Sequence, residues 1–378
     1  MNFFTFNNNK IVRYNNKILA RSSGTTPYSM ILEYADGVMI EPWHYYDRSN
    51  HIDKIFGTVV QISSSPNIWK WIYNDPIWSS YTGIVDSVLP VYEGNGPISQ
   101  PTRPKIKKVH AINSTGVTYM HSLFKGQTDI TELPWFDTSE VTNTEAIFSG
   151  CTSLTTIPAI DTSKVTDSDF MFSGCTALTS LPNLILTNDE STSYMFLNCT
   201  ALTNMQSLNL PNVKWMSQMF NGCTNLATIG TITTSNKLTS TVSMFEDCSS
   251  LTSVNPFDIS GITNSNFGGG AYRMFKNCSS LTTCPAFNTV NLRGMEEMYK
   301  GCTSITAVPL YDTTNALYMS YMFQDCVNVQ SGAYNLYNQA KDNANLRAYL
   351  CFDNCGTNTT SGTAELAQIP EYWGGTAT

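Results

Sequence analysis

Cysteine is the residue type in this chain whose spacing could carry chemistry. The 378 residues include eleven cysteines, and eight of them recur with gaps of 24, 24, 24, 25, 30, 24 and 24 residues. These eight are Cys151, Cys175, Cys199, Cys223, Cys248, Cys278, Cys302 and Cys326. Thiolates can bind metals or form disulfides, but no Cys-x-x-Cys pair or flanking His accompanies this series. We therefore predict a structural ladder of reduced, buried thiols, with disulfides between rungs and metal binding as the alternatives.

Histidines and carboxylates are the other candidates for chemistry. The four histidines, His44, His51, His110 and His121, all lie outside the regular Cys-bearing array. His44, Asp47 and His51 could supply three metal ligands, but we interpret them as polar residues of a surface or cap. No Gly-x-Ser-x-Gly, His-Glu-x-x-His or phosphate-loop pattern is present. We predict that the protein is not an enzyme and has no cofactor and no metal.

A column of small polar residues is the candidate ligand-binding surface. It lies two residues beyond an apolar position that follows each Cys by three residues. Its members are Glu132, Thr156, Ser180, Asn204, Thr228, Ser253 and Thr283. Binding hot spots usually need Trp, Tyr or Arg, so we expect a glycan or a weak multivalent contact here. The alternative is that these are only solvated strand residues.

The repeat around each Cys predicts the elements that position these side chains. An aromatic residue precedes each Cys by three positions, and Leu, Ile or Val follows by three. The residue just before each Cys is always Gly, Asn or Asp, the types that enter the left-handed αL region at low cost. Such a residue commonly ends a helix. A fixed period of this length is typical of a solenoid. We therefore predict an α/β solenoid, a leucine-rich-repeat-like array of ~24-residue coils, each with a short strand, an arc and a short helix.

The flanking composition suggests four segments. Residues 1–25 are predicted to form a small β element that could dock to a virion, and residues 26–105 an aromatic-rich β module that caps the array. The solenoid is expected over residues 106–330, with Gln127 in the Cys position of its first coil. An insert around residues 264–270 explains the 30-residue gap. Residues 331–378 are expected to form a C-terminal helix and cap.

Charge and hydropathy exclude some functions. The net charge of −8 and the isoelectric point near 5 argue against nucleic-acid binding, which favours a basic surface. No apolar run reaches the length of a membrane span. The first residues lack the basic and apolar regions of a signal peptide, so we do not expect one.

The repeat Met-Phe-x-Gly-Cys-Thr-x-Leu-Thr-x-Leu-Pro, over roughly residues 109–330, resembles the BspA-like leucine-rich repeat of bacterial surface proteins. The flanks resemble repeat proteins carried by phages of gut bacteria. The resemblance implies a non-enzymatic phage virion surface protein, such as a tail or head fibre, that binds a host-surface protein or glycan. Expected partners are other virion proteins, through the N-terminal segment, and a second copy of the chain. The alternatives are a structural virion decoration or adaptor without a host ligand, and a bacterial surface adhesin.

Overall fold

The computed structural model describes residues 106–263 and 270–377 fully, and before them the backbone of seven strands between residues 12 and 73. The chain divides into two compact units. Unit 1 comprises residues 1–164 and 180–184, and unit 2 comprises residues 165–179 and 185–378. The four segments expected from the sequence stay a prediction. No helix among the described residues has the length and hydropathy needed to cross a membrane.

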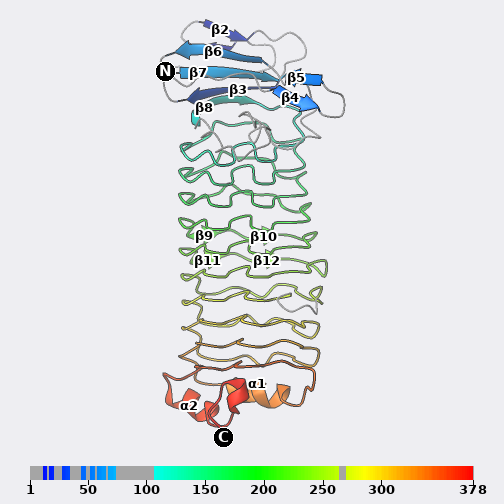
Figure 1. Cartoon of the computed structure of the whole chain (residues 1–378), viewed down its shortest axis with the longest axis vertical. Coiled ribbons are helices and arrows are strands. Elements are labelled where there is room, and N and C mark those ends of the chain that lie inside the picture. Colours follow the sequence, from blue (N-terminus) through cyan, green and yellow to red (C-terminus); the bar gives the residue numbers. More distant parts are fainter. Residues whose placement is uncertain are drawn as a thin grey trace. The chain divides into compact units, whose positions relative to one another are not determined.

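Unit 1 contains a four-stranded antiparallel sheet of order β6-β7-β3-β8 (Figure 1). Its strands are β3 (Tyr28–Tyr34), β6 (Thr58–Ser64), β7 (Asn67–Tyr73) and β8 (Ile106–Asn113). Two small hairpins are β1 (Val12–Tyr14) with β2 (Lys17–Ala20), and β4 (His44–Asp47) with β5 (Ile52–Ile55). Residues 1–11 and 74–105, which belong to the two N-terminal segments predicted from the sequence, lie outside the described residues.

After β8 the chain forms coils that stack by hydrogen bonds between residues about 24 apart. In unit 2, the Phe172 amide donates to Met195 O and the Phe196 amide donates to Met219 O, both at 2.8 Å. Parallel bridges join Asp167, Ser191 and Trp215 on successive coils. This arrangement is consistent with a repeat solenoid.

Within the described coils, regular strands pair only where the residue between the two strands of a coil is not proline. Strands β9 (Asn204–Met205) and β11 (Thr228–Ile229) pair in parallel, as do β10 (Leu208–Asn209) and β12 (Ile232–Thr233) (Figure 1). The residue between the two strands of each coil is Gln206 or Gly230, and the Gly230 amide donates to Met205 O at 2.9 Å. Five other coils have proline there, namely Pro134, Pro158, Pro182, Pro285 and Pro309, and the coil of Cys248 has Asn255 followed by Pro256. Proline has no N–H to donate, so those coils keep an extended but mostly unpaired backbone.

The short helix predicted in each coil is wrong: residues 106–263 and 270–332 contain no α-helix. The residue before Cys does adopt positive φ, as predicted, for example Gly174 at 73° and Asn198 at 58°. A second positive-φ residue lies four positions earlier, for example Phe170 at 56°. Between them, backbone amides alternate their acceptors: Met171 donates to Ser168 O in its own coil, and the next amide donates to the following coil. The segment is therefore two consecutive turns, because the first αL residue interrupts a helical ladder.

The core is built from columns of identical positions. In unit 2 the aromatic residues stack almost parallel, with ring centroids 5.3–5.5 Å apart from Phe172 to Phe323. The Cys and the apolar residue three positions beyond it are fully buried, as at Cys199 and Leu202. Every coil thus buries its apolar edge against its neighbours, which a single repeat could not do alone.

The C-terminal end of unit 2 carries α1 (Ala333–Ala340), α2 (Thr360–Leu366) and the 3-10 helix η2 (Glu371–Trp373). The predicted helix over residues 331–350 is shorter than expected. Glu365 on α2 accepts the amides of Gly332 and Tyr334 at 3.1 and 3.2 Å, which satisfies the exposed N–H groups at the start of α1. The Trp373 ring stacks on Phe352 at 6.3 Å and extends the aromatic column of unit 2.

Candidate functional site

The cysteine column forms a hydrogen-bonded ladder. Cys199 Sγ donates to Phe172 O of the preceding coil at 3.1 Å, and that carbonyl also accepts the Cys175 amide at 3.0 Å. The same thiol-to-carbonyl bond recurs at 3.0–3.1 Å for Cys151, Cys223, Cys248, Cys278, Cys302 and Cys326. Each aromatic carbonyl thus accepts one N–H from its own coil and one S–H from the next coil.

This ladder is not arranged for thiol chemistry. All eleven cysteines are free, and ten are buried, with Cys284 partly exposed. Burial raises the pKa of Cys223 to about 12 and raises the pKa values of Cys199, Cys248 and Cys278 well above their ordinary value. A nucleophilic or metal-binding cysteine needs the thiolate. Among the described residues, no group of three His, Cys, Asp or Glu side chains could hold a metal ion.

The histidines are not gathered into a site within the described residues. His44 lies in β4, where the side chains are not described, and His51 lies outside the described residues. His121 Nδ1 lies 3.1 Å from Glu145 Oε2 on the next coil of unit 1. Glu145 therefore pairs with His121, and its amide donates to Asn143 Oδ1 at 3.1 Å, in a tight turn rather than a helix start.

The small polar column lies on the surface of each unit. Glu132, Thr156 and Ser180 in unit 1 are exposed, as are Asn204, Thr228, Ser253 and Thr283 in unit 2. In unit 2, Asn204 and Thr228 are direct partners of the paired strands β9 and β11, and Thr228 Oγ1 donates to Asn204 Oδ1. These side chains are short, and some of their hydrogen-bonding capacity is already used between coils. The column therefore offers a flat, weakly contacting surface.

The sequence analysis missed a second surface, which we call the turn surface. It consists of the partly exposed positive-φ residues five positions before a Cys, which are Phe170, Tyr194, Gln218, Arg273, Glu297, Tyr321 and Leu350 in unit 2. Ser122 and Ala146 in unit 1 and Ser243 in unit 2 have the same backbone conformation but are buried. None is Gly, although an L-residue loses about 1–2 kcal/mol in this conformation. Their varied types carry no common signature, so the sequence offers no signal for them.

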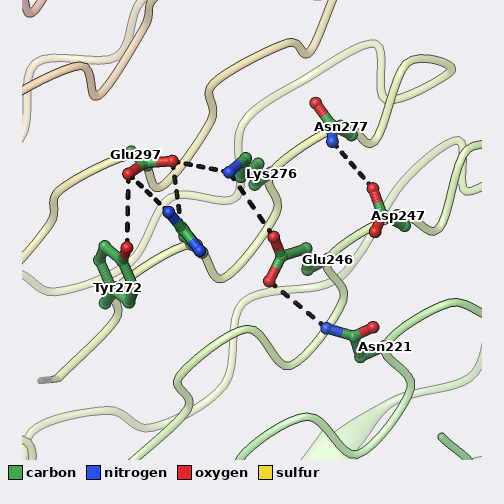
Figure 2. A network of polar contacts seen from close by, with 8 residues as sticks. Asn221, Glu246, Asp247, Tyr272, Lys276, Asn277 and Glu297 are labelled. Carbon is green, nitrogen blue, oxygen red and sulfur yellow. Dashed lines mark hydrogen bonds and ion pairs between the residues drawn. The ribbon is translucent and has the colours of Figure 1, made fainter. Parts of the chain in front are cut away.

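Turn-surface residues on neighbouring coils contact one another. The charged ones, Arg273 and Glu297, take part in the polar network of Figure 2. Arg273 makes two hydrogen bonds to Glu297 on the next coil, both at 3.0 Å. Lys276 Nζ lies 2.8 Å from Glu297 and 3.7 Å from Glu246, so this one cation links carboxylates on the coils before and after it. Asn221 Nδ2 donates to Glu246 at 3.4 Å, which extends the network to a fourth coil.

This network connects four neighbouring coils and so holds them in a fixed order. The side chains involved are mostly covered: Lys276 is 17% exposed, and Glu246 and Glu297 are each 14% exposed. Partly buried, bidentate pairs contribute more than exposed ones. Its cations and carboxylates neutralise one another, so the network leaves no open charge for a ligand.

Stacked coils with buried Leu-type columns are consistent with a repeat solenoid. The chain belongs to the family described as "Mycoplasma protein of unknown function, DUF285", whose profile matches residues 99–205, 190–305 and 239–348. Together these matches span residues 99–348, which is 250 of the 378 residues.

Two solved structures are similar to the chain. One is a leucine-rich repeat protein from Eubacterium ventriosum, with 15% identity and a TM-score of 0.30, covering 58% of this chain and 77% of that one. The other is the TLR13–ssRNA13 complex, with 14% identity and a TM-score of 0.24, covering 57% of this chain and 37% of that one. No curated protein matches the chain.

Proposed function

We propose that this chain is a non-catalytic binding protein whose solenoid of coils presents ligand-contacting side chains at a cell or particle surface. The observation that supports it best is the turn surface. A position that would favour Gly on conformational grounds instead carries Phe, Tyr, Gln, Ser, Arg and Glu in successive coils of unit 2. Strained backbone that displays diverse side chains is commonly found at functional sites.

The small polar column is a second proposed contact surface of the same function. Its exposed members, from Glu132 to Thr283, can donate and accept hydrogen bonds with sugars or polar peptides. Each contact would be weak, so useful affinity would require several copies of the chain acting together.

The proposed location is the virion surface of a phage that infects gut bacteria, with residues 1–25 docked to other virion proteins. The resemblance of the flanking segments supports this location. A structural decoration or adaptor of the virion, and a bacterial cell-surface adhesin, are the alternatives.

The test is binding of the purified, fluorescently labelled full chain to a panel of gut bacteria. We expect saturable binding to some strains, reduced by Phe170→Ser with Tyr194→Ser on the turn surface. The matched double variant Asn204→Ala with Thr228→Ala tests the small polar column in the same unit. A folded chain that binds none of the strains would contradict the binding function and favour the structural role.

A further inference from the structure

Three tyrosines, two of them exposed and Tyr321 half-buried, form a cluster at the C-terminal end of unit 2. We call Tyr321, Tyr349 and Tyr372 the tyrosine cluster. The Tyr321 and Tyr349 rings have centroids 5.7 Å apart, and the Tyr349 and Tyr372 rings have centroids 5.8 Å apart. Tyr349 is 46% exposed and Tyr372 is 54% exposed. They are among the few large hydrophobic side chains exposed in the described part of the chain.

The backbone holds these rings on successive levels. The Tyr321 amide donates to Tyr349 O at 3.0 Å, and the amide of Leu350 donates to Tyr372 O at 2.8 Å. The Trp373 ring, next to Tyr372, stacks on Phe352 in the aromatic column. The cluster is therefore attached to the packed core at each level, and little conformational entropy remains to be lost on binding.

The ring orientations cover less aromatic face than parallel stacking does, because an inclined pair places the edge of one ring against the face of the other. Tyr321 and Tyr349 are nearly perpendicular, at 88°, and Tyr349 and Tyr372 are inclined at 59°. By contrast, Phe170 and Tyr194 on the same type of surface lie parallel at 4.4 Å and 3°, so they cover each other's faces. The tyrosine cluster therefore leaves more aromatic face available for stacking against a ligand than the Phe170–Tyr194 pair does.

Polar and charged groups lie beside the rings. Lys300 Nζ lies over the Tyr321 ring, 5.4 Å from its centre, and so occupies one face of that ring. Gln324 Nε2 donates to Asp353 at 2.7 Å on the coils that carry Tyr321 and Tyr349. Glu371, the residue before Tyr372, is exposed. The surroundings therefore contain one cation and two carboxylates, and they supply donors and acceptors without a strong single charge.

We propose that the tyrosine cluster is a binding site for a neutral glycan. A pyranose ring presents a face of C–H groups that packs on an aromatic face, while its hydroxyls need polar partners at the edge. Tyrosine provides both an apolar ring and a polar tip. A protein partner would need a wider apolar area to form a stable interface, and here a charged side chain, Lys300, lies over one of the rings. This proposal rests on the binding function proposed above.

The experiment is affinity electrophoresis of the full chain in gels containing soluble mannan, β-glucan or xyloglucan. We expect at least one polysaccharide to retard the wild-type chain. Tyr349→Ala and Tyr372→Ala should each weaken the interaction about tenfold, as loss of an aromatic anchor does. Tyr349→Phe should retain most of it because the ring remains. Trp215→Ala is the matched control, since Trp215 is an exposed aromatic elsewhere in unit 2.

Melting temperatures of all variants show whether the C-terminal end of unit 2 is still folded. Binding to bacterial cells, measured in parallel, distinguishes this glycan site from the surface-binding function proposed above. The glycan proposal is overturned if no polysaccharide retards the folded wild-type chain, or if Trp215→Ala weakens retardation as much as Tyr349→Ala. Cell binding that survives glycan removal but disappears with Tyr349→Ala would assign the cluster to a protein partner. Cell binding that is unchanged in both Ala variants would leave the general function standing without this site. Absence of any cell binding, together with tyrosine-dependent retardation, would contradict only the proposed surface function.

Discussion

Replacing the buried carboxyl group of Asp189 should change how the stability of unit 2 depends on pH. Asp189 is 0% exposed, and Ser168 Oγ donates to its Oδ2 at 2.6 Å, while its Oδ1 has no hydrogen-bond partner. Burial raises the pKa of Asp189 to about 8, and the nearby carboxylates of Asp167 and Asp169 add to this, while the bond from Ser168 opposes it. Asp189 is therefore neutral in the folded chain at pH 7.

The direction of the effect follows from where each state holds the proton. An unfolded Asp loses its proton near its ordinary pKa of 3.8, whereas the folded chain keeps it up to about pH 8. The contribution of this group to the free energy of unfolding is therefore fully present below about pH 4 and is lost as pH rises through about 8. With about 1.4 kcal/mol for each pH unit, the loss is on the order of 4 kcal/mol by pH 7.

Asp189→Asn removes this dependence, because the amide is neutral in both states and its oxygen can still accept from Ser168. Urea unfolding followed by aromatic fluorescence at pH 5, 6, 7 and 8 measures the difference between the two proteins. The free energy of unfolding of the variant, relative to that of the wild-type chain, should rise by about 1.4 kcal/mol for each pH unit. Asp312→Asn is the control, because hydrogen bonds from Thr314 lower the pKa of exposed Asp312. A constant difference between Asp189→Asn and wild type across this range would refute the argument.

Three further predictions concern local structure. Gly126 has φ 72° and open space around an added Cβ. Gly126→Val should therefore lower the free energy of unfolding by about 1–2 kcal/mol, and Gly126→Asn should lower it by much less. Equal melting temperatures for the two variants would contradict this. The ten buried thiols should resist alkylation in the folded chain and react in denaturant without reductant, as mass spectrometry can count; a linked pair such as Cys175–Cys199 would contradict it. Glu365→Gln should weaken the start of α1 by about 1 kcal/mol, seen as faster amide exchange at Gly332 and Tyr334, whereas exposed Glu371→Gln should not.

The sequence was sufficient to predict the features that a coil repeats in chemically distinctive residues. The aromatic, Cys and Leu columns recur as the same or closely similar residue types, so their burial and alignment follow from the period. The αL position before each Cys was also predictable, because only Gly, Asn and Asp occupy it among these coils. Pro134, Pro158 and Pro182 indicate short strands, because proline has no N–H to donate. The backbone of those coils is mostly unpaired.

The predicted helices were wrong because their periodicity has another cause. Met171 and Phe172 point inward in a chain of turns just as they would on a helix, so apolar spacing does not distinguish the two. The deciding feature is the αL residue at Phe170, whose side chain does not signal positive φ. The turn surface depends on that backbone conformation, so it was not predictable either. Tyr321, Tyr349 and Tyr372 approach one another only because a C-terminal segment adds one more level to the coils.

The Gln at position 127, in the Cys position of the first coil, indicates why the later coils have cysteine there. In later coils the Cys thiol faces a carbonyl of the preceding coil, as Cys151 Sγ does with Phe124 O at 3.0 Å, and a donor is needed. The first coil follows β8 instead, and there Gln127 Oε1 accepts the amide of Ile106 at 2.9 Å, in a buried position. An acceptor is needed at this one position, and a thiol sulfur accepts hydrogen bonds weakly.

Gln127→Met keeps a side chain of similar length but leaves the buried Ile106 amide without a partner. We expect a loss of about 1–3 kcal/mol in the free energy of unfolding and rapid hydrogen exchange at Ile106. Gln127→Glu retains an acceptor oxygen and should protect that amide at pH 4 to 5, so it separates the hydrogen bond from the packing. Because the Gln side chain joins β8 to the first coil, protection should fall locally and the amides of unit 2 should be unaffected. Unchanged exchange at Ile106 in Gln127→Met would show that packing alone selects the residue in this column.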